Sequence, residues 1–138
     1  MTESPSSPDG RTTILVVERD PHIRVLEALF LGDAGYVVVF ADDGEAALRQ
    51  ARELRPALVI TEILVPRLDG LALCRRLKED PETRGVMVLI FSILTASARA
   101  QDAGADAFLR KPLAEDTLVS AVRQLLARHG SATPGERA

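Results

Sequence analysis

The sequence predicts an α/β fold in which helices cover both faces of a doubly wound parallel sheet of five strands. Short runs of apolar, β-branched residues alternate five times with segments whose apolar residues recur at helical spacing. The first run, Ile14–Val17, is apolar throughout, which is typical of a strand buried on both faces.

The first helix begins at Asp20 and Pro21. Asp20 is the expected N-cap, and Pro21 suits the first helical position because its missing N–H has no helical partner there. The helix closes between Gly32 and Gly35. Its expected buried stripe consists of Ile23, Leu26, Leu29 and Phe30.

The second helix lies between two strands, Tyr36–Phe40 and Ala57–Thr61. Asp42 and Asp43 begin this helix, and Pro56 ends it because proline cannot continue a helix. Its inward-facing residues are expected to be Ala47, Leu48, Ala51 and Leu54.

A loop, Ile63–Gly70, leads to the third helix, which carries Leu71, Cys74 and Leu77 on one face. We expect Cys74 to be a small core residue rather than a sensor thiol. The fourth strand is Val86–Phe91.

The chain ends in a short fourth helix, a strand and a long helix. The alanine-rich fourth helix spans Thr95–Ala103, and the fifth strand is Ala107–Leu109. The last helix spans Ala114–Arg128 and has Gly130 as its expected C-cap. Its apolar stripe consists of Leu118, Val122, Leu125 and Leu126.

The chain of 138 residues is predicted to hold one domain, residues 12–130. Residues 1–11 and 131–138 are predicted to be disordered tails, since they are rich in polar residues and proline and have little apolar surface to bury. The overall composition, 46% hydrophobic and 27% charged residues, is that of an ordinary globular protein.

Several classes of function are excluded by composition. The longest apolar run, Val86–Leu94, is too short to cross a membrane, and the N-terminus lacks the pattern of a secretory signal, so we expect a cytoplasmic protein. One cysteine and two histidines disfavour a zinc site. The net charge of −3 provides no basic field for nucleic acid.

Polar side chains follow four of the predicted strands. Glu18 and Arg19 come after the first strand, Glu62 after the third, Ser92 after the fourth and Lys111 after the fifth. In folds of this class, ligands bind beyond the C-terminal ends of the strands. The plainer alternatives are solvated carboxylates and a surface lysine, with Ser92 bonding only to the backbone.

Four segments, ILVVERDP, LVITEILVPRLDG, VLIFS and FLRKPL, stand in the order and spacing that resemble the receiver domain of bacterial two-component response regulators. The resemblance covers nearly everything between the tails. It implies a flavodoxin-like receiver fold with strand order 2-1-3-4-5, in which the first and fifth helices share one face.

The resemblance also implies roles for the residues at the strand ends. In that family an acidic pair binds Mg²⁺, an aspartate accepts a phosphoryl group from a histidine kinase, a hydroxyl and a lysine hold the phosphoryl oxygens, and an aromatic residue changes rotamer. By position, Glu18 and Arg19 fall on the acidic pair, Glu62 on the phosphoacceptor, Ser92 on the hydroxyl, Phe108 on the aromatic residue and Lys111 on the lysine. Phe108 can equally be simple packing, and Asp69-Gly70 matches the usual turn before the third helix.

Two departures from the family pattern predict a degenerate site. Arg19 cannot bind a cation, because a guanidinium stays protonated and has no acceptor atom. Glu62 is one methylene longer than aspartate, and phosphoryl transfer depends on position and charge neutralisation. We therefore expect that Mg²⁺ binding is lost and that the chain needs no cofactor. We also expect Arg19 to replace the metal ion by bridging Glu18 and Glu62.

A third departure is the interval between Ser92 and Lys111, which is shorter than in the family by about one helical turn. It predicts a shortened fourth helix, on the surface where partners of the family dock.

The preferred hypothesis is a pseudo-receiver, a non-enzymatic signalling module that binds proteins without accepting phosphate. A histidine kinase or an output protein is the expected partner, a homodimer is allowed, and neither nucleic acid nor a membrane is expected. The alternative is a working phosphoacceptor that uses Glu62 or another residue. A flavodoxin-like nucleotide- or flavin-binding domain is disfavoured, because no glycine-rich phosphate loop is present.

Overall fold

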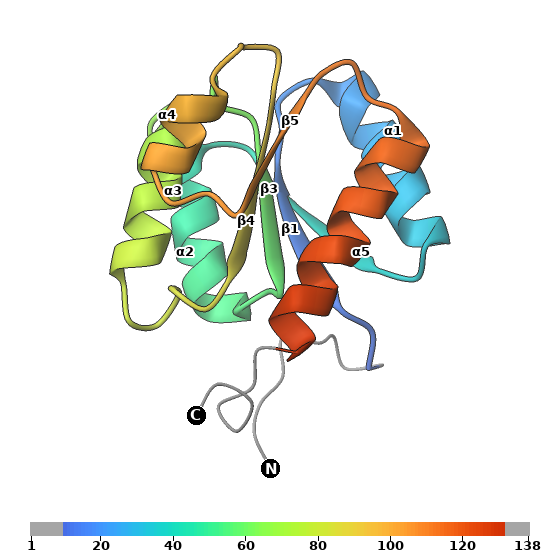
Figure 1. The fold of residues 1–138 in the computed structure, drawn as a ribbon, viewed down its shortest axis with the longest axis horizontal. Helices are drawn as coiled ribbons and strands as arrows, with labels where there is room; N and C mark the ends of the chain where they lie inside the picture. Colours follow the sequence, from blue (N-terminus) through green and yellow to red (C-terminus); the bar gives the residue numbers. More distant parts are fainter. Residues whose placement is uncertain (1–9, 132–138) are drawn as a thin grey trace.

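The structure, a computed structural model, describes residues 10–131. Five parallel strands form one sheet in the order β2-β1-β3-β4-β5, which confirms the predicted topology. Strands β1, β3 and β4 lie side by side in the middle of the sheet (Figure 1). The strands are β1 (Thr13–Val17), β2 (Val37–Ala41), β3 (Leu58–Thr61), β4 (Met87–Ser92) and β5 (Ala107–Arg110).

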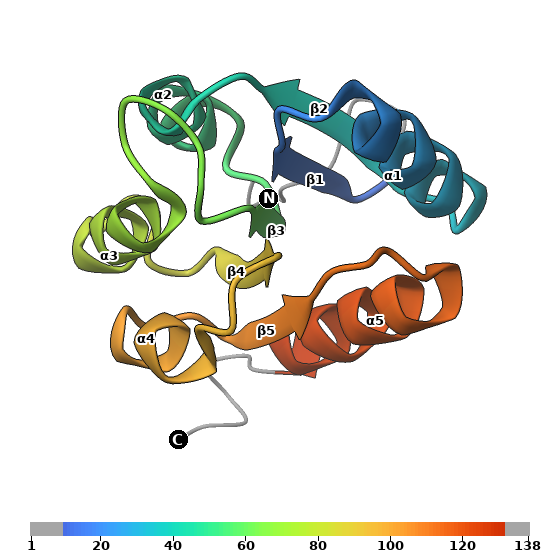
Figure 2. The ribbon, with the colours of Figure 1, turned by 90° about the horizontal axis from the view of Figure 1, so that it is seen from above.

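Helices cover both faces of the sheet. They are α1 (Pro21–Asp33), α2 (Gly44–Leu54), α3 (Gly70–Glu79), α4 (Ser97–Asp102) and α5 (Glu115–Ser131). Seen from above, α1 and α5 lie on one face and α2, α3 and α4 on the other (Figure 2). This arrangement agrees with the expectation for the first and fifth helices, and α4 is a short helix within the predicted range Thr95–Ala103.

The core consists of two clusters that alternate along the strands, as the twofold period of a β-strand requires. Leu15, Val17 and Val59 belong to the cluster under α2, α3 and α4, which also holds Cys74. Burial raises the pKa of the Cys74 thiol to about 11, which agrees with an unreactive core residue. The second cluster packs under α1 and α5; its members include Ile14, Val16, Leu58, Ile60, Leu118, Val122 and Leu125.

Helix α1 differs from its prediction in which residues it buries. Asp20 caps it as expected, accepting a hydrogen bond from the backbone N–H of His22 at 2.9 Å. However, Leu26 and Leu29 are exposed, whereas Glu27 and Leu31 are fully buried. Residues that face the sheet recur every four positions from Ile23, and this helical phase, rather than apolarity alone, selects Glu27 and Leu31.

Two other boundaries also differ. Leu54 was expected to face inward, but it is the last residue of α2 and is exposed, because the core does not extend past the end of the helix. Gly130 does not end α5, which continues to Ser131, since one glycine within a helix costs only about 1 kcal/mol. The rest of the predicted tails, residues 1–9 and 132–138, lies outside the described residues.

No helix of residues 10–131 is long and apolar enough to cross a membrane. The strand register places the ends of β1, β3, β4 and β5 at one edge of the sheet, because Val17 pairs with Thr61, Thr61 with Ile90 and Ser92 with Arg110. The candidate site lies at this edge.

Candidate functional site

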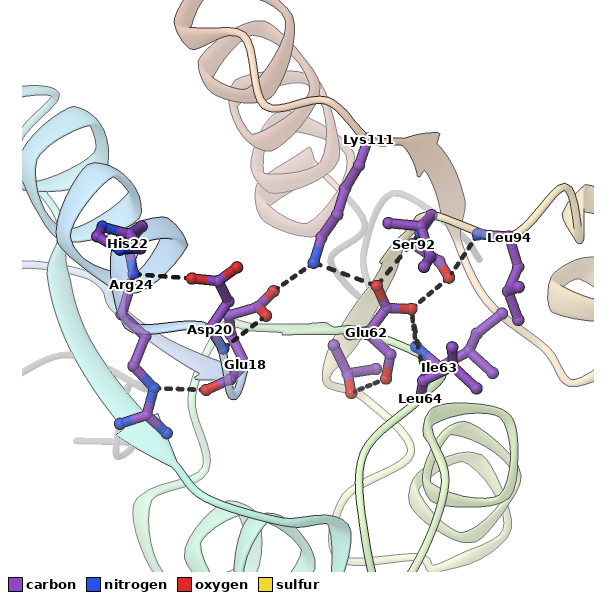
Figure 3. A network of polar contacts seen from close by, with 12 residues as sticks. Glu18, Asp20, His22, Arg24, Glu62, Ile63, Leu64, Ser92, Leu94 and Lys111 are labelled. Atoms are coloured by element: carbon purple, nitrogen blue, oxygen red, sulfur yellow. Dashed lines mark hydrogen bonds and ion pairs between the residues drawn. The ribbon is translucent and has the colours of Figure 1, made fainter.

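Glu18, Glu62, Ser92 and Lys111 meet at the C-terminal edge of the sheet (Figure 3). Each follows or ends a different strand, β1, β3, β4 and β5 respectively. These four side chains therefore lie together, as the sequence predicts. Glu18, Glu62 and Ser92 are buried, so the ordinary reading of two solvated carboxylates does not apply.

The Glu62 carboxylate accepts hydrogen bonds on both oxygens. Oε1 accepts from the Ser92 hydroxyl and from the backbone N–H groups of Ile63 at 2.6 Å and Leu64 at 3.4 Å. Oε2 accepts from the backbone N–H of Ile93 at 3.2 Å and lies 3.1 Å from Lys111 Nζ. Donors from both the β3–α3 and the β4–α4 loops thus converge on one carboxylate.

Lys111 bridges the two carboxylates of the site. Its Nζ lies 2.8 Å from Glu18 Oε1 as well as 3.1 Å from Glu62 Oε2. The three side chains are only 5–8% exposed. The same Nζ lies 5.6 Å from the centre of the Phe91 ring, within range of a cation–π contact.

The shifts in pKa follow from this pairing. Burial alone would raise the pKa of Glu62, but hydrogen bonds from Ser92 and Lys111, and the charge of Lys111, hold it below the usual value. Burial likewise opposes the charge on Lys111, but the bonds and charges of Glu18 and Glu62 outweigh it and raise the pKa of Lys111. At neutral pH Glu62 is therefore a carboxylate and Lys111 an ammonium group.

Arg19 does not bridge the carboxylates, so that expectation is wrong. The residue is exposed, and its side chain makes no ion pair or hydrogen bond with any residue from 10 to 131. Arg19 lies exposed, and both carboxylates already pair with Lys111 Nζ, at 2.8 and 3.1 Å. Lys111 occupies the bridging place instead.

The loop after β1 is held by Arg24, whose role the sequence prediction missed. Its guanidinium donates to the backbone oxygens of Glu18 and Ala41 and pairs with Asp42 at 2.9 Å. It also lies over the Phe40 ring, 5.0 Å from its centre. The only sign of this role in the sequence is that Arg24, a charged residue, follows Ile23 of the predicted buried stripe.

Gly70 positions the loop after β3. Its backbone N–H donates to the Ile63 carbonyl at 2.9 Å, and a Cβ atom here would overlap with the carbonyl oxygen of Glu62 and lie 2.9 Å from Ile63 Cα. Asp69 caps α3 by accepting from the N–H of Ala72 at 2.9 Å. The Asp69-Gly70 pair thus sets the path of the backbone directly behind Glu62.

Phe108 does not join the polar cluster. It is half-buried on β5, opposite Ile90 of β4, and packs against the core cluster under α2, α3 and α4. The packing alternative accounts for its position.

The residues present do not fit Mg²⁺, which takes oxygen ligands in near-octahedral geometry. Glu18 and Glu62 are both bound to Lys111, and Arg19 contributes no ligand atom. Within residues 10–131 no three His, Cys, Asp or Glu side chains are grouped closely enough to hold a metal ion.

Comparison with known proteins identifies similar chains. The family model of the response regulator receiver domain matches residues 14–123. The chain is 36% identical over 121 residues to the DNA-binding dual master transcriptional regulator RpaA of a Synechocystis species, covering 83% of this chain and 49% of RpaA. It is 37% identical over 116 residues to the response regulator MprA of Mycolicibacterium vanbaalenii, covering 83% and 50%. The chain therefore spans about half the length of these curated relatives.

Solved structures give the same result. A putative response regulator from Chloroflexus aurantiacus has a TM-score of 0.82 and 34% identity, with 86% of this chain and 99% of that chain covered. The signal receiver domain of a signal transduction histidine kinase from Syntrophus aciditrophicus has a TM-score of 0.79 and 35% identity, with 84% and 90% covered.

Proposed function

The chain belongs to the family of response regulator receiver domains, and we propose that it is a pseudo-receiver, which binds other proteins and signals without being phosphorylated. The observation that supports this proposal is the saturation of the Glu62 carboxylate. The Ser92 hydroxyl, the Lys111 ammonium and the N–H groups of Ile63 and Ile93 all contact its oxygens.

The same donors would have to serve an incoming phosphoryl group. Phosphoryl transfer needs an in-line nucleophile and donors that neutralise charge as it develops on the equatorial oxygens. Here the Ser92 hydroxyl and the Lys111 ammonium already bind Glu62, and a carboxylate with a lowered pKa is a weaker nucleophile. Position 19 holds an arginine, so the third carboxylate that a metal ion would need is absent from this position.

We further propose that Glu62 holds the domain in one conformation by imitating a phosphorylated aspartate. Its longer side chain brings a carboxylate to Ser92 and Lys111, the two side chains that hold phosphoryl oxygens in the family. The imitation is incomplete, because a carboxylate carries one charge whereas a phosphoryl group carries nearly two.

The partners that follow from this proposal are proteins. A histidine kinase or an output protein that recognises the fixed conformation is the expected class, acting in the cytoplasm, and self-association is compatible with it. The net charge of −3 disfavours direct binding of nucleic acid by this chain. No catalytic role is proposed.

The test is incubation with acetyl phosphate or phosphoramidate, with and without Mg²⁺, followed by intact-mass measurement. We expect no mass increase in either condition. A Mg²⁺-dependent gain of one phosphoryl group would contradict the proposal and favour the working phosphoacceptor. The Glu62→Gln variant would then tell whether Glu62 or another residue is the acceptor.

A further inference from the structure

Glu27 is a fully buried carboxyl group that the candidate site does not use. It lies on the sheet-facing side of α1, one turn from Ile23 and one turn from Leu31, and is 0% exposed. Leu31 and Ile23 both pack in the core cluster under α1 and α5. An acidic side chain therefore stands in a row of otherwise apolar residues.

Neither oxygen of the Glu27 carboxyl has a hydrogen-bond partner. A buried carboxylate without a partner is strongly destabilised, whereas the protonated form loses much less on leaving water. Complete burial without a hydrogen-bond partner thus favours the neutral acid.

Three charged groups act on Glu27 from the elements around it. Burial, together with the negative charge of Glu18 at the end of β1, raises the pKa of Glu27, while Lys111 after β5 and Arg24 on α1 lower it; the resulting value is about 8. Both cations have other partners, since Lys111 pairs with Glu18 and Glu62, and Arg24 pairs with Asp42. The two cations that act on Glu27 are therefore shared with other carboxylates.

We propose that Glu27 is a proton-binding site that couples the packing of α1 to the ion pairs of Lys111. With its proton, Glu27 is neutral and α1 packs on the sheet. When the proton passes to solvent, a third carboxylate acts on Lys111, which weakens the Lys111–Glu62 pair, and the charge loosens α1 from the core. This inference does not depend on whether Glu62 accepts phosphate.

The pH dependence of stability has a definite sign. The pKa of Glu27 is about 8 in the folded chain and has the ordinary glutamate value of 4.5 in the unfolded chain. Between these values the folded state holds a proton that the unfolded state has lost. Raising the pH through this window therefore increases the unfolding equilibrium constant, by at most about tenfold per pH unit, and the effect levels off above the folded pKa.

The first experiment follows the Glu27 side-chain carboxyl carbon by NMR as the pH is raised. We expect a titration midpoint near 8. A midpoint near the ordinary value of a glutamate would overturn the proposal, because Glu27 would then be solvated.

The second experiment measures urea unfolding across the same pH window for the parent and for Glu27→Gln, Glu27→Leu and Glu53→Gln. Glu53 is an exposed residue of α2 and serves as the matched control. We expect Glu27→Gln and Glu27→Leu to remove the rise in the unfolding constant and Glu53→Gln to retain it. Glu27→Leu keeps the test valid if the amide variant does not fold. Unchanged pH dependence in Glu27→Leu would overturn the proposal.

The third experiment tests the coupling to the site. The amide signals of Ile63 and Ile93 and the side-chain signals of Lys111 should shift with the Glu27 midpoint in the parent and not in Glu27→Leu. If Glu27 titrates near 8 while these signals stay still, the coupling to Lys111 is wrong.

Discussion

The ammonium nitrogen of Lys111 lies 3.1 Å from Oε2 of Glu62, and this ion pair joins the ends of β5 and β3. Glu18 shares the same lysine at 2.8 Å, so one cation holds together three strand ends. A charge centre built in this way depends on one lysine rather than on the arginine beside Glu18.

Replacing Lys111 by methionine is expected to destabilise the domain strongly. Lys111→Met keeps an unbranched side chain, one heavy atom shorter, but leaves two buried carboxylates without their counter-charge. Breaking a buried pair in this way costs about 3–5 kcal/mol. Urea unfolding at neutral pH measures the change, and a loss below about 1 kcal/mol would show that the site is solvated in the folded protein.

Arg19→Ala is expected to change the free energy of unfolding by less than about 0.5 kcal/mol, as for surface substitutions in general. Arg19 is exposed and pairs with no residue of the described chain. The same urea experiment compares it directly with Lys111→Met. A loss comparable to that of Lys111→Met would restore Arg19 as the bridging residue.

The positions of the site residues could be predicted from the sequence, but the contacts between them could not. Parallel strands end at one edge, so Glu18, Glu62, Ser92 and Lys111 had to lie near one another once the strands were located. Which cation reaches the carboxylates depends on the direction in which each side chain leaves its loop. The sequence alone does not tell whether Lys111 or Arg19 reaches the two carboxylates.

The burial of α1 shows a second limit of the sequence. The apolar residues Leu26 and Leu29 suggested the buried stripe, whereas packing against the sheet selected the face that carries Glu27 and Leu31. A helix that is largely apolar on all sides has a weak periodic signal, so its rotation is decided by tertiary contacts.

Gly70→Ala is expected to disrupt the site through the backbone. The added methyl group would overlap with the carbonyl oxygen of Glu62, so the loop or the strand end must move. Overpacking of this kind costs about 1–3 kcal/mol. Gly85→Ala is the matched control, because nothing lies within 4 Å of a Cβ atom there. Equal melting temperatures for the two variants would contradict the close approach at Gly70.

Ser92→Ala is expected to lower stability by about 1.5–3 kcal/mol, the value typical of a hydrogen bond to a charged group. The Ser92 hydroxyl is fully buried and donates to the Glu62 carboxylate. Ser120→Ala, on the exposed side of α5, controls for the substitution itself. If both variants unfold at the same urea concentration as the parent, the Ser92–Glu62 bond does not form in solution.

The combined substitution Arg19→Asp and Glu62→Asp is expected to create a receiver that accepts phosphate in the presence of Mg²⁺. The first change adds a carboxylate beside Glu18, which gives a metal ion oxygen ligands. The second change shortens the side chain at position 62, whose carboxylate now binds Ser92 and Lys111. These two donors then become free to hold phosphoryl oxygens. Either change alone should fail, because Glu62→Asp lacks the metal ligand and Arg19→Asp retains the saturated carboxylate.

Intact mass after incubation with acetyl phosphate measures the gain, and the combination of Arg19→Asp with Glu62→Asn is the control, since an amide cannot accept the group. The two effects should be strongly non-additive because they act at one site. If the Asp–Asp variant binds Mg²⁺ and still gains no phosphoryl group, the block lies outside Arg19 and Glu62. The short helix α4, which begins at Ser97 after the loop that follows Ser92, is then the next element to test.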